Sequence, residues 1–188
     1  MNHFEVTHGI VLRIGPRDKR YLIVFDALYG KRVLRWQMSE TVRAVVGGLI
    51  SYRCYQFATT WYITHCELIA WPAVWAQDDL AFLHRCVALV ERGCMWHVRD
   101  EHIVQCLYNL YETFSVHLDM VKKVMLASIL YHAGIFACAL VDEYEMIRLI
   151  SMLDDIRLDT PLDHNCMQWL DVLIHQGMQL LPYQVGEP

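Results

Sequence analysis

The sequence predicts an α+β protein in which a five-stranded OB-fold barrel precedes an all-helical part. Five short segments rich in β-branched and aromatic residues lie within residues 1–71, and turn residues separate them. From residue 72 onward, apolar residues recur at helical spacing. Hydrophobic residues make up 55% of the chain, which excludes disorder as its main state. The change of pattern near Trp71-Pro72 predicts a barrel domain, 1–71, and a helical domain, 72–188.

Each predicted strand is bounded by turn residues. We expect strands at His8–Arg13, Tyr21–Phe25, Val33–Trp36, Leu49–Phe57 and Trp61–Ile69. The turn signals between them are Gly15–Asp18, Tyr29–Lys31 and Ala58–Thr60. Five short strands in about 65 residues suit a small closed barrel, either an OB-fold or an SH3-like barrel. Residues 38–43 have mixed propensity, and we expect a loop or a single helical turn there.

Five helices are expected in the second part. Asp78 and Asp79 precede the stripe Leu80, Leu83, Val87 and Val90, and Arg92-Gly93 closes that helix. The other expected helices are marked by Ile103, Leu107, Leu110 and Phe114, by Met120–Phe136, by Tyr144–Leu153, and by Met167, Leu170, Leu173 and Ile174. Thr160-Pro161 is the expected start of the last one.

The cysteines and the longest uncharged stretch indicate the expected cellular compartment of the protein and whether a membrane span is expected. Seven scattered cysteines and an N-terminus without the features of a signal peptide predict reduced thiols in a cytoplasmic protein. Val124–Val141 has no Asp, Glu, Lys or Arg over 18 residues, the minimum for a membrane span. Amphipathic helices on both sides favour a buried central helix over a membrane span.

Motifs of catalysis and cofactor binding are missing from the sequence. It has no nucleotide-binding glycine motif, no GxSxG and no HExxH, so we expect neither an enzyme nor a cofactor. The best metal candidate is the set Cys94, His97, His102 and Cys106, whose spacing suits tetrahedral zinc. Because His102 and Cys106 also open an amphipathic helix, where Cys is a common core residue, we expect no metal there.

Charge is divided unevenly along the chain. Residues 1–72 carry nine Lys or Arg against five Asp or Glu, a net +4, whereas residues 73–188 carry seven against sixteen, a net −9. This division suggests two units with different partners. Cations that neutralise phosphates and aromatic rings that stack on bases are what single-strand binding on a small barrel needs. The expected phosphate contacts are Arg13, Arg17, Lys19, Arg20, Lys31, Arg32 and Arg35, placed at turns or on a solvent face, with Tyr21 and Trp36 as stacking candidates.

Three segments, in order, resemble one protein family. THGIVLRIGPRDKRYLIVFDALYGKR (Thr7–Arg32) looks like the opening of the DNA repair protein RecO, with a GIVL-type strand, a turn, a second strand and a Gly-Lys turn. ELIAWPAVWAQDDLAFLHRCVALVE (Glu67–Glu91) is similar to the family's crossing from barrel to first helix. VKKVMLASILYHAGIFA (Val121–Ala137) is similar to its central helix.

The resemblance implies an OB-fold with a helical C-terminal domain. It implies a recombination mediator that binds and anneals single-stranded and double-stranded DNA and helps load recombinase, with a RecR-like protein and single-strand-binding protein as partners. Many relatives carry a four-cysteine zinc motif after the central helix. Here Cys138 alone lies there, so that zinc is expected to be absent. The alternative is a protein-interaction scaffold whose barrel no longer binds DNA.

Overall fold

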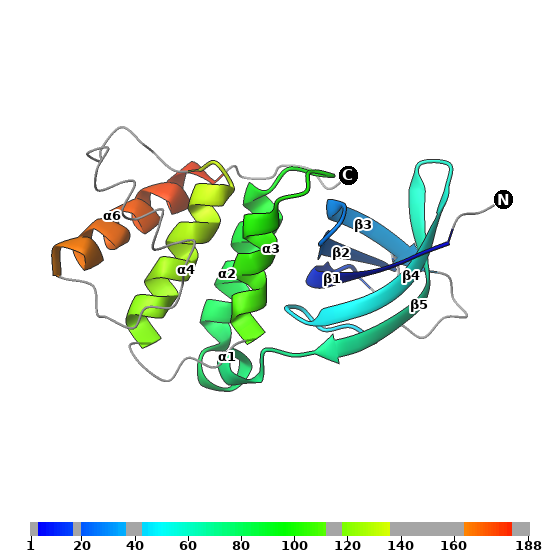
Figure 1. Ribbon diagram of the computed structural model, residues 1–188, viewed down its shortest axis with the longest axis horizontal. Coiled ribbons are helices and arrows are strands. Elements are labelled where there is room, and N and C mark those ends of the chain that lie inside the picture. The colour runs from blue at the N-terminus through cyan, green and yellow to red at the C-terminus, as the bar shows by residue number, and fades with distance from the viewer. Residues whose placement is uncertain (1–3, 17–19, 37–42, 112–117, 136–163, 182–188) are drawn as a thin grey trace.

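The computed structural model describes residues 4–16, 20–36, 43–111, 118–135 and 164–181. Five strands come first and helices follow, as Figure 1 shows. The strands are β1 (Phe4–Ile14), β2 (Tyr21–Asp26), β3 (Gly30–Trp36), β4 (Leu49–Phe57) and β5 (Thr60–Ala70). They form a closed barrel in the order β1-β2-β3-β5-β4, in which β4 pairs back with β1. β3 and β5 are parallel and the other pairs antiparallel, which is the OB-fold arrangement and confirms the predicted fold class.

Two predicted strands begin several residues too late: β1 begins at Phe4 rather than at the predicted His8, and β3 also begins earlier than predicted. β3 begins at Gly30, three residues before the predicted Val33, and the turn before it occupies residues 27–29. The error in β3 came from Lys31 and Arg32, whose charges are typical of a solvated turn. Both side chains have partners inside the protein, and therefore the strand can include them.

Strand β2 is buried on both of its faces, which explains its unbroken apolar sequence. Leu22 and Val24 point into the barrel, where they pack with Leu34 and Ile50. Ile23 and Phe25 point outward and belong to the core that the helices share. The barrel and the helices are thus joined by one continuous apolar core rather than by a loose linker.

The helices are α1 (Ala73–Asp78), α2 (Leu80–Gly93), α3 (Glu101–Tyr108), α4 (Leu118–His132) and α6 (His164–Leu180), with a short 3-10 turn, η1, at Asn109–Tyr111. Carboxylates cap two of them, as the first turn of a helix prefers. Asp79 accepts a hydrogen bond from the backbone N–H of Phe82 at 2.9 Å, and Asp100 accepts from those of His102 and Ile103. The predicted start of a helix at Asp79 is confirmed, while Asp78 ends α1.

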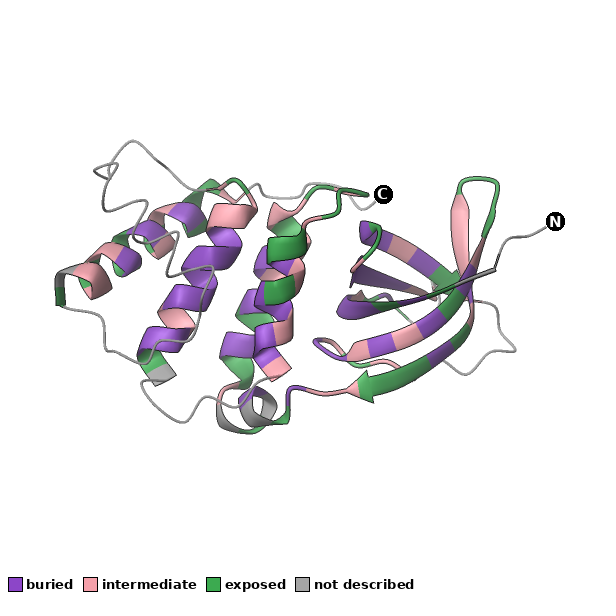
Figure 2. Cartoon of the chain, in the orientation of Figure 1, coloured by how far each residue is buried: buried purple, intermediate pink, exposed green. Residues whose placement is uncertain are grey.

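Helix α4 occupies the middle of the helical part. α2 and α3 separate it from the barrel, and α6 lies on its other side (Figure 1). Figure 2 shows α4 buried along most of its length, in keeping with the uncharged sequence from Val124 onward. Among the described residues, no helix is both long enough and apolar enough to cross a membrane. The predicted helix at Tyr144–Leu153, the predicted start at Thr160-Pro161 and the marker Phe114 lie outside the described residues.

Candidate nucleic-acid interface

Two of the expected phosphate contacts instead hold the barrel against α2. The Lys31 ammonium is fully buried, and its Nζ donates to the backbone carbonyl of Glu91 at 2.6 Å. A cation is favourable there because Glu91 lies in the last turn of α2, at the negative end of the helix dipole. The Glu91 carboxylate lies 3.0 Å from Arg13 Nε. Lys31 therefore does not face solvent as predicted, and Arg13 is already paired.

Lys31 has a further partner in the connection between α2 and α3. Its Nζ lies 4.5 Å from the centre of the Trp96 ring, a cation–π contact. Burial lowers the pKa of the Lys31 ammonium, and the neighbouring Cys94 and Glu91 act in the opposite direction. The side chain is thus part of the interface between barrel and helices.

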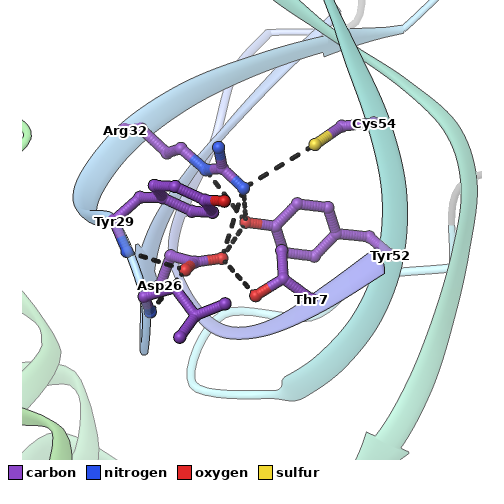
Figure 3. Close-up of polar contacts among 7 residues, drawn as sticks. Thr7, Asp26, Tyr29, Arg32, Tyr52 and Cys54 are labelled. Carbon is purple, nitrogen blue, oxygen red and sulfur yellow. Dashed lines mark hydrogen bonds and ion pairs between the residues drawn. The ribbon is translucent and has the colours of Figure 1, made fainter. Parts of the chain in front are cut away.

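Arg32 is also buried, contrary to the prediction that it faces solvent. It lies inside the barrel with 1% of its surface exposed, beside Asp26 and Tyr52 (Figure 3). Its Nη2 is 3.3 Å from Asp26 Oδ2 and donates to the Tyr52 hydroxyl at 2.7 Å, while its Nε donates to the same hydroxyl at 3.0 Å. Because β3 alternates, Arg32 points inward where Lys31 points outward.

Asp26 is the acceptor that organises this buried cluster. Its Oδ2 accepts from Thr7 Oγ1 at 3.1 Å, from Arg32 and from the Tyr52 hydroxyl. Its Oδ1 accepts from the backbone N–H groups of Leu28 and Tyr29, which fixes the turn between β2 and β3. Burial and the Asp26 charge raise the pKa of Tyr52 well above its usual value, so the hydroxyl stays protonated and donates. The cluster is a structural ion pair, not a solvent-facing phosphate site.

The remaining predicted contacts differ in exposure. Arg35 is exposed on β3, as predicted. Arg20 is half-buried in a left-handed conformation, with φ 46°. Tyr21 is half-buried and its ring lies against Gly15, while Trp36 is half-buried against the core of the barrel. Arg17 and Lys19 lie outside the described residues. Of the four that the structure describes, Arg35 lines a groove.

This groove, of ≈ 270 Å³, opens above β3. Its lining comes from three places in the chain: β3, the β4–β5 hairpin, and the connection between α2 and α3. The lining residues are Val33, Arg35, Thr59, Thr60, Trp61, Trp96 and His97. Val33 and Arg35 are two residues apart on β3 and so share its outer face. The groove therefore brings an exposed arginine together with two tryptophans and two threonines.

The α2–α3 connection is held in place against β3. The backbone N–H of His97 donates to the carbonyl of Lys31 at 2.9 Å, and Trp96 pairs with Lys31 as an isolated parallel bridge. His97 has φ 58°, a left-handed conformation that residues other than glycine adopt infrequently. Gly30, at φ 70°, has no room for a Cβ because the Val98 carbonyl approaches it. These contacts hold Trp96 and His97 beside the groove.

Sequence patterns identified part of this groove. Arg35 was expected as a phosphate contact, and Trp61 was expected as the first residue of the fifth strand. Trp96 and His97 were not expected here, because they follow a predicted helix some distance along the chain. The bridge to Lys31 brings them to the barrel, and no local pattern encodes such a long-range contact.

The four candidate metal ligands have separate surroundings. Cys106 is buried with its Sγ 2.9 Å from Ser128 Oγ, and the His102 ring stacks on that of His132 with centroids 4.5 Å apart. His97 lines the groove, and burial raises the pKa of the Cys94 thiol to about 12. Among the described residues, no three His, Cys, Asp or Glu side chains are grouped so as to hold a metal ion. Cys138 lies outside the described residues.

A scan against protein-family models and a search of the curated proteins find no match for this chain. The barrel and the groove therefore provide the evidence on its function.

Proposed function

We propose that this protein binds single-stranded DNA in the groove above β3 and acts as a recombination mediator rather than as an enzyme. In this role it anneals DNA strands and helps to load recombinase. The partners would be a RecR-like protein and single-strand-binding protein, in the cytoplasm, where buried thiols such as Cys66 and Cys86 stay reduced. The observation that carries the DNA-binding role is the meeting of Arg35 with Trp61 and Trp96 in an open groove of an OB-fold.

The chemistry of the groove suits an unpaired strand. Indole rings offer flat apolar faces on which bases stack, and such stacking contributes about 1–3 kcal/mol per base. Stacking requires bases that are unpaired, whereas a duplex hides their faces. Arg35 supplies a charge that can neutralise a phosphate beside a stacked base. OB-folds bind oligonucleotides through the face of strands 2 and 3 and the loop between strands 4 and 5, and this groove takes residues from both β3 and that loop.

Burial of two cations and the pairing of a third set the expected salt dependence. Seven phosphate contacts would give a slope of log affinity against log salt of about −5 for a single strand, at about 0.7 per contact. Lys31 and Arg32 are buried, and Arg13 is paired with Glu91. Four of the seven remain, namely Arg17, Lys19, Arg20 and Arg35. They would give a slope of about −3.

A titration with a fluorescent oligothymidylate at four salt concentrations tests the proposal. We expect binding at low salt with a slope near −3, a shallower slope for Arg35→Ala, and loss of most binding when Arg17, Lys19 and Arg20 are all changed to Glu. Arg85→Ala, at an exposed arginine of α2 outside the groove, is the matched control and should bind as the wild type does. Annealing of complementary oligonucleotides by the same variants tests the mediator role.

Two outcomes would contradict the proposal. If the wild-type protein does not bind the oligonucleotide at low salt, the barrel has lost DNA binding and the scaffold alternative takes its place. If the wild type binds while Arg35→Ala and the triple variant, both folded, keep its affinity and salt slope, the DNA surface lies elsewhere on the protein.

A further inference from the structure

Trp61 occupies the point where the barrel core meets the groove. It lines the groove and also packs against the apolar interior of the barrel. The tip of the β4–β5 hairpin that precedes it is exposed, with Phe57, Ala58 and Thr59 all facing solvent. The orientation of the Trp61 ring therefore depends on what touches it from the barrel side.

One contact on that side is the guanidinium of Arg32. The Arg32 Cζ lies 4.8 Å from the centre of the Trp61 ring and 4.5 Å from that of Tyr29, and the two ring centres are 6.4 Å apart. The three groups thus form one compact set of planar side chains at the rim of the barrel. Arginine suits this position because its guanidinium is flat and can stack on a ring while donating at its edge.

The guanidinium itself is fixed from behind. Tyr52 accepts from both Nε and Nη2, and Asp26 carries the balancing charge (Figure 3). Neither Arg32 nor Asp26 is accessible to a ligand, since both are essentially fully buried. Held at two of its nitrogens, the guanidinium has little freedom to rotate, and a ring stacked on it shares that restriction.

We propose that Arg32 is a positioning residue that holds Trp61 in a fixed orientation, so that the indole is a preformed platform for an unpaired base. This inference rests on the proposed function of the groove. A platform ordered before binding does not lose side-chain entropy when the base arrives, and so the complex is tighter. Arg32 thereby contributes to affinity without contacting the DNA.

The substitution Arg32→Lys distinguishes a positioning role of Arg32 from a direct contact between Arg32 and a phosphate. Lysine keeps a cation beside Asp26 but has no planar group to stack on Trp61. In the titration with oligothymidylate, we expect the affinity of Arg32→Lys to fall by about five- to tenfold while the salt slope stays that of the wild type. In a Trp61→Leu background the same change should have no further effect, because Arg32 acts through that ring. Arg85→Lys serves as the control for the arginine-to-lysine change.

Fluorine NMR of protein labelled with 5-fluorotryptophan gives a readout that does not require DNA. The Trp61 signal is assigned by its absence from Trp61→Leu. In Arg32→Lys that signal should shift or broaden, while the other tryptophan signals stay in place. If Arg32→Lys does not fold, Tyr29→Leu removes the more exposed ring of the set, and we expect a smaller loss of affinity that also disappears in the Trp61→Leu background.

The positioning role is overturned if a folded Arg32→Lys binds as the wild type does, if its salt slope becomes shallower, or if its effect adds to that of Trp61→Leu. It is equally overturned if Tyr29→Leu, used in its place, leaves affinity unchanged. A wild-type protein that fails to bind overturns both this role and the proposed function. A wild type that binds and depends on Trp61 but not on Arg32 overturns the positioning role alone.

Discussion

Replacing Asp26 by Asn should be among the most destabilising isosteric changes in this protein. Asp26 is fully buried and accepts hydrogen bonds from Thr7, Arg32 and Tyr52 and from two backbone N–H groups. The amide keeps the shape but removes the charge, which leaves the guanidinium of Arg32 buried without a counter-ion. Breaking a buried pair in this way costs about 3–5 kcal/mol. For a chain of this length that corresponds to a fall in Tm of about 6–20 °C.

The matched control is Asp171→Asn, the same chemical change in an exposed pair. Asp171 lies 2.8 Å from Lys123 Nζ with 57% of its side chain exposed, and exposed pairs contribute about 1 kcal/mol or less. Urea unfolding followed by circular dichroism at pH 7 measures both variants. Adding Arg32→Met to Asp26→Asn should restore part of the lost stability, because the unpaired charge is then gone. If Asp26→Asn costs no more than Asp171→Asn, the Asp26–Arg32 pair is not the energetic centre inferred here.

Three further predictions concern single groups. Burial raises the pKa of the Cys94 thiol to about 12, so its alkylation by iodoacetamide at pH 8, followed by mass spectrometry, should be slower by at least about tenfold in native than in urea-unfolded protein; equal rates would contradict this. The pKa of Tyr52 is raised by burial and by Asp26, so above pH 10 the unfolded state loses this proton first and stability falls as pH rises; Tyr52→Phe should flatten this decline in the free energy of unfolding, measured with urea, by up to about 1.4 kcal/mol per pH unit, and an unchanged slope would count against it. Gly30→Ala should destabilise by about 2 kcal/mol in the same assay, because φ is 70° and the Val98 carbonyl leaves no room for a Cβ, whereas a neutral effect would show that the turn can relax.

The sequence was most informative about the barrel because its strands have strong local signals. β-branched and aromatic runs bounded by turns marked all five strands, and β4 was predicted with its observed bounds. The start of β3 was missed since Lys31 and Arg32 are charged, and charge normally indicates solvent. Their burial depends on Glu91 and Asp26, partners that no local pattern identifies.

The groove could be predicted only in part, because it is assembled from distant segments. Alternation along β3 correctly places Arg35 outside the barrel, whereas Tyr21 and Trp36, not Trp61, were the expected stacking residues. The same alternation, applied to Arg32, would have indicated an inward side chain. Arg32 was nevertheless predicted to face solvent, because arginine is rarely buried. A buried arginine is tolerated when its charge is paired. Trp96 and His97 reach the groove through a bridge to β3, which depends on how the helices pack.

The uneven division of charge along the chain has a partly internal explanation. Arg13 and Lys31 belong to the basic segment, yet both meet Glu91, which belongs to the acidic one. Attraction between the two segments thus contributes to docking the barrel on α2, and a net +4 overstates the charge that the barrel offers to a polyanion. Salt should therefore act on the two kinds of cation differently. It screens exposed Arg35 and weakens its contact with phosphate, whereas the fully buried ammonium of Lys31 keeps its bond to the Glu91 carbonyl. DNA binding should accordingly be lost at salt concentrations that leave the barrel and the helices packed together.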